Sequence, residues 1–85
     1  MKIRIMPESL KSNLNLIEKK AKSIVIEEKG RIVKVNIEPV AFGLKAIIIQ
    51  LTRREDLDQD PLMDKLQAIE NISSAEIIDV RRLSL

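Results

Sequence analysis

The fold is decided by residues 31–52, which read RIVKVNIEPVAFGLKAIIIQLT. From 31 to 38, apolar and polar side chains alternate, which is the period of a strand with one buried face. The stretch 44–52 is rich in isoleucine, which is typical of a strand in the middle of a sheet. Pro39 cannot donate to a ladder and belongs at a strand end or edge. We therefore expect an antiparallel pair of strands joined by a turn around Ala41-Phe42-Gly43.

On the N-terminal side of this pair, the pattern predicts a strand and a helix. Residues 2–6 alternate between polar and apolar and end at Pro7. Apolar side chains at helical spacing predict a helix from about 13 to 25. Gly30 closes the connection to the next strand. Three residues offer oxygens that could cap the start of this helix: Ser9, Ser12 and Asn13.

On the C-terminal side, a polar segment precedes a second helix and a last strand. Asp60-Pro61 has the character of a capping residue followed by a proline in the first helical turn. The apolar spacing then predicts a helix that ends near Asn71, a residue suited to the left-handed conformation. Residues 72–83 predict the final strand.

The predicted order is therefore β-α-β-β-α-β, within a single domain over residues 1–85. The simplest packing is an α+β, ferredoxin-like split β-α-β-β-α-β sandwich, a four-stranded antiparallel sheet with two helices on one face. The other face of the sheet would then be uncovered, and it is either polar or a docking surface.

Composition excludes several kinds of chemistry. The chain has 14 Ile, 5 Val and 10 Leu but a single Phe, and it has no Cys, His, Trp or Tyr. Without Cys or His it has no thiolate nucleophile, no Ser-His-Asp triad and no Cys-based zinc site. Its only glycines are Gly30 and Gly43, so no glycine-rich phosphate loop is present. We expect no cofactor, no metal and no enzyme activity.

The charge is mildly polarised along the chain. The net charge is +2, with +5 over residues 1–45 and −3 over residues 46–85. The longest apolar run, Ala46 to Ile49, is far shorter than the roughly 20 residues of a membrane span. No apolar stretch near Met1 is long enough for a signal peptide. We therefore expect a cytoplasmic protein with no membrane contact.

Phe42 is the residue whose role the pattern leaves open. A lone aromatic ring in a small domain usually belongs to the core. A turn between two strands, however, lies mostly at the surface. A rigid aromatic held between Pro39 and Gly43 is also typical of an anchor at a protein interface.

Three stretches resemble one known family. Residues 39–45, PVAFGLK, resemble the Pro-Ile-Ala-Phe-Gly-Leu/Ile-Lys stretch of the guanine-nucleotide exchange domain of elongation factor 1-beta. Residues 6–9, MPES, and residues 79–83, DVRRL, resemble the archaeal branch of that family. Chain length and element order agree as well, so the resemblance covers essentially the whole chain.

The resemblance implies a non-enzymatic translation elongation factor. Such a factor binds the GTPase elongation factor 1-alpha, docks near its nucleotide site and weakens the Mg²⁺ and phosphate contacts, so that GDP is exchanged for GTP. Eukaryotic relatives carry a Lys before the last residue that intrudes on the Mg²⁺ site. Ser84 stands there in this chain, so this role either falls to Arg81 or Arg82 or is absent. The partner-binding residues that the resemblance implies are Ala41, Phe42, Gly43, Lys45, Arg81 and Arg82.

Two other classes of function remain as alternatives. A ferredoxin-like RNA-binding module would use the mild basic bias, although the chain lacks the sheet aromatics that stack bases. A small-molecule-binding or dimerisation module would use the open sheet face or an edge strand. Under the leading hypothesis the chain contacts no nucleic acid directly and is a monomer when free.

Overall fold

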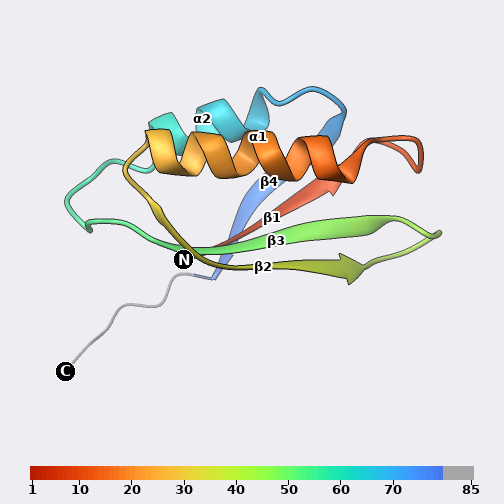
Figure 1. Cartoon of the computed structure of the whole chain (residues 1–85), viewed down its shortest axis with the longest axis horizontal. Coiled ribbons are helices and arrows are strands. Elements are labelled where there is room, and N and C mark those ends of the chain that lie inside the picture. Colours follow the sequence, from red (N-terminus) through yellow and green to blue (C-terminus); the bar gives the residue numbers. More distant parts are fainter. Residues whose placement is uncertain (80–85) are drawn as a thin grey trace.

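The computed structural model describes residues 1–79 as a sheet covered by two helices (Figure 1). The elements follow the predicted β-α-β-β-α-β order. Their bounds are β1 Lys2–Pro7, α1 Leu14–Glu27, β2 Arg31–Pro39, β3 Lys45–Thr52, α2 Asp60–Gln67 and β4 Ile72–Asp79. The last strand was expected to reach residue 83, and its predicted end lies outside the described residues.

The four strands form one antiparallel sheet in the order β2-β3-β1-β4. Both helices lie on the same face of this sheet (Figure 1). The expected ferredoxin-like α+β sandwich is therefore confirmed. The hairpin between β2 and β3 is confirmed as well, with Pro39 opposite Lys45 as its last ladder pair.

The core is aliphatic throughout the described residues. On the sheet, β1 and β3 supply fully buried isoleucines, and β3 is buried on both of its faces from Ala46 to Ile49. The helices cover them with Ile17, Val25 and Leu66. Burying each such side chain contributes about 1.5–3 kcal/mol. This core closes without any aromatic ring.

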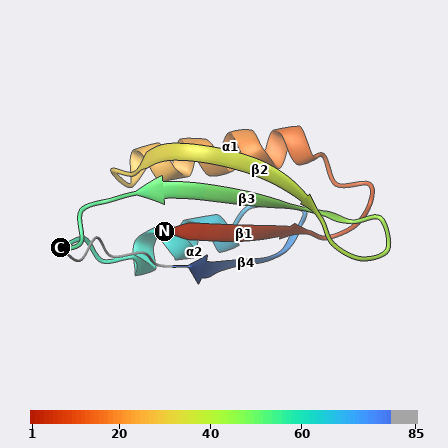
Figure 2. The ribbon, with the colours of Figure 1, turned by 90° about the horizontal axis from the view of Figure 1, so that it is seen from below.

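The face of the sheet opposite the helices is turned toward the viewer in Figure 2. The strand register places mainly polar residues on it, among them Lys34, Gln50 and Glu76. Along β1, the buried Ile3 and Ile5 alternate with partly exposed side chains on the other face. On that face Arg4 forms an ion pair with Glu76 of β4. Of the two expectations for this uncovered face, the polar one therefore describes it.

α1 begins and ends in well-defined caps. As one of the expected candidates, Asn13 caps the start, and its Oδ1 accepts a hydrogen bond from the Leu16 N–H at 3.1 Å. The helix continues two residues past the predicted end, through the exposed Ile26 and Glu27, and finishes in a hydrogen-bonded cap. At its end the Gly30 N–H donates to Val25 O at 2.8 Å and the Lys29 N–H to Ile26 O at 3.1 Å, which is a Schellman motif.

In this motif the left-handed residue is Lys29 with φ 64°, and not the glycine that follows it. Gly30 is required for another reason. A Cβ there would lie 2.6 Å from Val25 Cγ1 and 2.9 Å from Val25 O. The glycine lets the chain pass close to the end of α1.

α2 corrects two expectations. Asp60 was expected to cap the helix, but it is the first helical residue, and its N–H donates to Asp58 Oδ1 at 3.0 Å. The N-cap position is Gln59, whose side chain makes no capping bond, and Asp58 is the residue that bonds the first amide of the helix. The helix ends at Gln67 rather than near Asn71, although Asn71 has the expected positive φ of 68°.

β2 is an edge strand with two irregular features. Ile32 lies opposite Leu51 and Lys34 opposite Gln50, so one extra residue, Val33, forms a bulge between them. Pro39 ends the strand.

Substitutions at the end of α1 test the separate roles of Lys29 and Gly30. Lys29→Gly should raise the free energy of unfolding by up to about 1 kcal/mol, because glycine adopts positive φ without strain. Gly30→Ala should lower it by about 1–3 kcal/mol through the clash with Val25. Urea denaturation followed by circular dichroism measures both. Destabilisation by Lys29→Gly would contradict the cap geometry.

Lys65 joins the two helices at the same end. Its Nζ donates to Glu28 Oε2 at 2.7 Å and to Glu27 Oε1 at 2.9 Å. The hydrogen bonds to Glu28 and Glu27 raise the pKa of Lys65 above its ordinary value. While it stays protonated, Lys65 therefore links α2 to the C-terminal end of α1.

This link should be visible in the pH dependence of stability. The pKa of Lys65 is higher in the folded state than in the unfolded state. Its contribution to the free energy of unfolding is therefore full below the unfolded pKa of about 10.4. This contribution is lost as the pH rises through the folded pKa. Urea midpoints of wild type and Lys65→Met, measured from pH 8 to 11.5, should therefore converge at high pH. A difference that does not change with pH would contradict this role.

Candidate functional site

The connection between β2 and β3 spans residues 40–44 and contains a tight β-turn. The Leu44 N–H donates to Ala41 O at 3.0 Å, so Phe42 and Gly43 occupy the two central positions. Both have positive φ, 55° and 78°, the pattern of the type I′ turn that fits the twist of a hairpin. The Val40 N–H also donates to Leu44 O at 2.8 Å. The backbone of this tip is therefore fixed by hydrogen bonds.

Phe42 projects from this tip into solvent. Its side chain is 94% exposed, the most exposed of the large apolar side chains among residues 1–79. The alternative that places Phe42 in the core is therefore wrong. Positive φ costs a bulky residue about 1–2 kcal/mol, and the ring gains no burial that would offset this strain. The fold itself gains no stability from an aromatic here, which is typical of a residue kept for binding.

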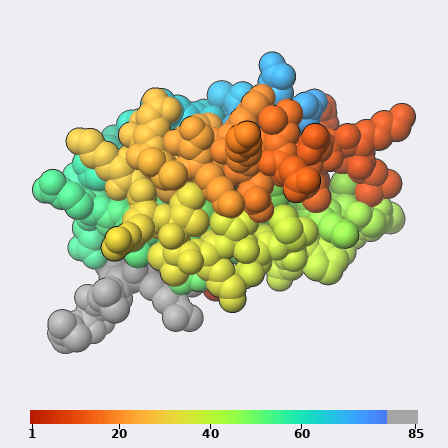
Figure 3. Space-filling model, in the orientation of Figure 1, coloured from red at the N-terminus to blue at the C-terminus, as the bar shows by residue number. Residues whose placement is uncertain are grey.

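A second turn presents another exposed apolar residue beside the hairpin. The Ser12 N–H donates to Ser9 O at 3.1 Å, which places Leu10 and Lys11 at the centre of this turn. The Ser12 hydroxyl and the Glu8 N–H both bond to Asn71 O. Figure 3 shows this loop next to the hairpin at one end of the molecule.

Leu10 is 69% exposed and lies against the hairpin. A Cβ on Gly43 would lie 3.3 Å from Leu10 Cδ2. Val40, at 49%, is also exposed close to the tip. Sequence reasoning missed Leu10, and the signal that could have found it is an apolar residue in a polar loop that belongs to no strand or helix pattern.

Between the two turns lies a cleft of about 250 Å³. Its walls come from the end of β1, the following loop, and the hairpin. Lys45, which follows the hairpin tip at the start of β3, is the only charged residue among residues 1–79 that lines it. The lining residues are Pro7, Ser9, Leu10, Ser12, Leu14, Gly43, Leu44 and Lys45.

The predicted partner-binding residues divide into two groups. The structure brings Ala41, Phe42, Gly43 and Lys45 together at the hairpin end, and all four are exposed. Arg81 and Arg82 lie outside the described residues.

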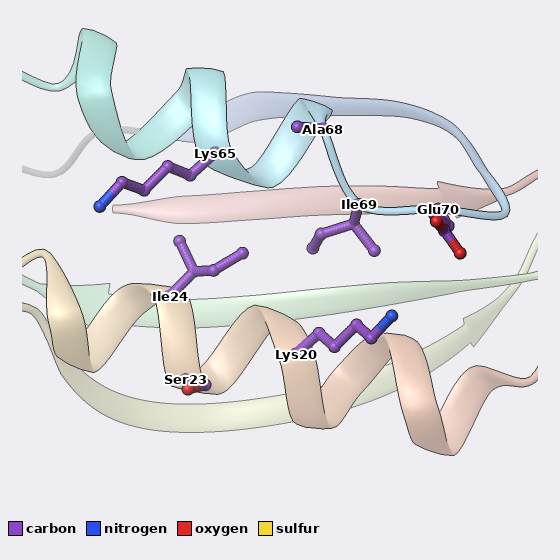
Figure 4. Close-up of a pocket in the computed structure, with 7 residues that line it drawn as sticks. All are labelled: Lys20, Ser23, Ile24, Lys65, Ala68, Ile69 and Glu70. Carbon is purple, nitrogen blue, oxygen red and sulfur yellow. The ribbon is translucent and has the colours of Figure 1, made fainter.

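A larger hollow of about 400 Å³ runs between the two helices (Figure 4). Ile24 of α1 and Ile69 face each other across it, while Lys20 and Glu70 lie toward one end. Lys65 at the other end is engaged by Glu27 and Glu28. This groove contains none of the predicted site residues.

The chemistry of the hairpin end is that of contact rather than catalysis. It offers an exposed ring, an exposed leucine and one ammonium group. Within residues 1–79, no cluster of acidic side chains could hold a metal ion. Neither helix in that range is long and apolar enough to cross a membrane. The structure is therefore a ferredoxin-like domain with two exposed apolar turns at one end, a surface whose chemistry suits contact with a protein.

Comparison with known proteins gives this module a family. The profile of the EF-1 guanine nucleotide exchange domain matches residues 1–83. Elongation factor 1-beta of Pyrococcus horikoshii is 36% identical over 83 residues, covering 95% of this chain and 90% of that protein. Elongation factor 1-beta of Sulfolobus acidocaldarius is also 36% identical, covering 95% and 91%. The chain belongs to the EF-1 guanine nucleotide exchange domain family, and these relatives are archaeal members.

A solved structure shows the same fold in a distant sequence. The ACT domain from GTP pyrophosphokinase of Chlorobium tepidum superimposes with a TM-score of 0.59 at 18% identity. The match covers 88% of this chain and 91% of that domain. At this identity the likeness concerns the fold alone.

The strain at Phe42 gives a direct test of its role in stability. Phe42→Ala should change the free energy of unfolding by no more than about 0.5 kcal/mol, because the ring is exposed. Phe42→Gly should match or exceed wild type because it removes the positive-φ strain. As a contrast, Ile49→Ala should cost about 2–5 kcal/mol. Urea denaturation measures all three, and a large loss for Phe42→Ala would show that the ring supports the fold.

Proposed function

We propose that residues 1–85 act as one exchange domain that promotes replacement of GDP by GTP on the GTPase elongation factor 1-alpha. In this proposal the hairpin tip docks near the nucleotide site of the GTPase. No proton transfer or covalent step is involved, and the chain is not an enzyme. Because its partner in this proposal is a translation factor, the chain acts in the cytoplasm.

The physical basis of such exchange is negative coupling between two ligands. A GTPase holds GDP through P-loop amides, a lysine and Mg²⁺. A factor that binds the nucleotide-free conformation more tightly must weaken nucleotide binding by the same ratio. A thousandfold weakening needs about 4 kcal/mol of difference in contact free energy.

Phe42 is the single observation that carries the proposal. It is 94% exposed in the free protein, so docking would bury its full apolar surface. Buried aromatic anchors are among the side chains that contribute 2 kcal/mol or more to an interface. The hydrogen-bonded turn fixes the backbone beneath the ring before binding, which lowers the ordering cost. The family assignment supports the same role.

The proposal is tested by the release of fluorescent GDP from the cognate GTPase. The wild-type chain should accelerate release, and Phe42→Ala should lower its kcat/KM at least about thirtyfold, the equivalent of 2 kcal/mol. Val33→Ala is the matched control, since Val33 is an exposed apolar residue near the opposite end of β2. This control should exchange as wild type does.

Two results would overturn the proposal. One is a folded wild-type chain that does not accelerate release of the nucleotide. The other is a Phe42→Ala variant that exchanges as fast as the Val33→Ala control.

A further inference from the structure

We propose that the cleft between the two turns receives an acidic side chain of the GTPase, with Lys45 as its counter-charge and Leu10 as its outer wall. This inference rests on the proposed function and adds the chemistry of a second contact. It concerns a contact that Phe42 does not make.

The charge of the cleft is the first observation. Lys45 is the only ionisable residue among its eight lining residues, and Lys45 forms no ion pair with any part of residues 1–79. All five ion pairs in that range involve other cations. An ammonium group at the rim of a cleft without carboxylates attracts an anion.

The hydrogen-bonding groups of the cleft point to the same kind of occupant. Ser9 Oγ accepts a bond from the Lys11 N–H at 3.2 Å and donates to none of residues 1–79. Its hydroxyl proton is therefore available to an acceptor. Ser12 differs, because its hydroxyl already donates to Asn71 O at 3.0 Å. A carboxylate, which only accepts, suits both a hydroxyl donor and an ammonium donor.

The size and surroundings of the cleft favour a protein side chain over a free ligand. Pockets for small molecules occupy about 300–1,000 Å³, and this cleft has about 250 Å³. Leu10, which lines the cleft, and Phe42, which precedes the lining residue Gly43, are both exposed. An occupant that also covers these apolar tips must belong to a surface, which a protein partner provides.

Leu10 forms the outer wall through its turn. The turn from Ser9 to Ser12 is closed by its own backbone bond and tied to Asn71. Leu10 then lies against Gly43, the residue that follows Phe42. Its branched side chain supplies an apolar part of the cleft lining.

The role of the Lys45 charge is tested by removing it, by keeping it in another side chain, and by removing a different lysine. Lys45→Gln should lower kcat/KM for GDP release from the cognate GTPase about tenfold and make the rate less dependent on salt. Lys45→Arg should retain most of the rate. Lys34→Gln is the matched control, because Lys34 is an exposed lysine on β2, opposite Gln50. It should stay within twofold of wild type.

A chemical test identifies the occupant directly. Carbodiimide treatment of the complex with the nucleotide-free GTPase joins an amine to a carboxylate that touches it. Mass spectrometry should find Lys45 linked to an Asp or Glu of the GTPase, and Lys34 unlinked. Leu10→Ala should lower kcat/KM about fivefold, whereas Ile26→Ala, a change at another exposed residue near the far end of α1, should not.

The outcomes separate this inference from the proposed function. One outcome is that the wild-type chain exchanges normally, Lys45→Gln and Lys34→Gln have the same kcat/KM, and Lys45 is not cross-linked. This outcome would contradict the proposed contact in the cleft but not the role of Phe42. A wild-type chain that does not accelerate exchange would overturn both.

Discussion

The structure depends on the burial of β3 on both faces. Its residues from Ala46 to Ile49 are enclosed by the helices on one side and by polar side chains of the neighbouring strands on the other. The register of β1 against β3 is fixed by its alternation, because a one-residue slip would turn Ile3 and Ile5 to the polar face. β2 and β3 then run together to the end of the sheet, where they carry the turn.

Scaffold and contact surface use different kinds of side chain. The core is packed with aliphatic side chains alone, so the fold does not need the ring of Phe42 for its stability. The ring stands on a strained, hydrogen-bonded turn. Leu10 stands on a second closed turn beside it. Two separate loops thus present apolar groups on rigid backbone, and the partner's surface must match the spacing between them.

Periodicity was enough to predict the element order and the antiparallel hairpin, and Asn13 was one of three candidate caps. Helix ends were less predictable, because the cap at the end of α1 lies beyond its last buried residue and Asp58 rather than Asp60 bonds the first amide of α2. The direction of Phe42 could not be predicted from a pattern, since a lone ring at a break has no neighbours with which to form a period. Leu10 was missed because its importance lies in a contact with Gly43, far along the chain.

The irregular edge of β2 has a consequence for the protein at high concentration. A straight edge strand of nine residues would present free backbone groups that a second copy could pair with. The bulge at Val33 twists this edge, Lys34 places a charge beside it and Pro39 removes a donor at its end. A translation factor must remain dispersed in a crowded compartment while it displays apolar tips. Because strand pairing at the edge of β2 is disfavoured, association is directed to the apolar tips, which a partner of complementary shape can cover.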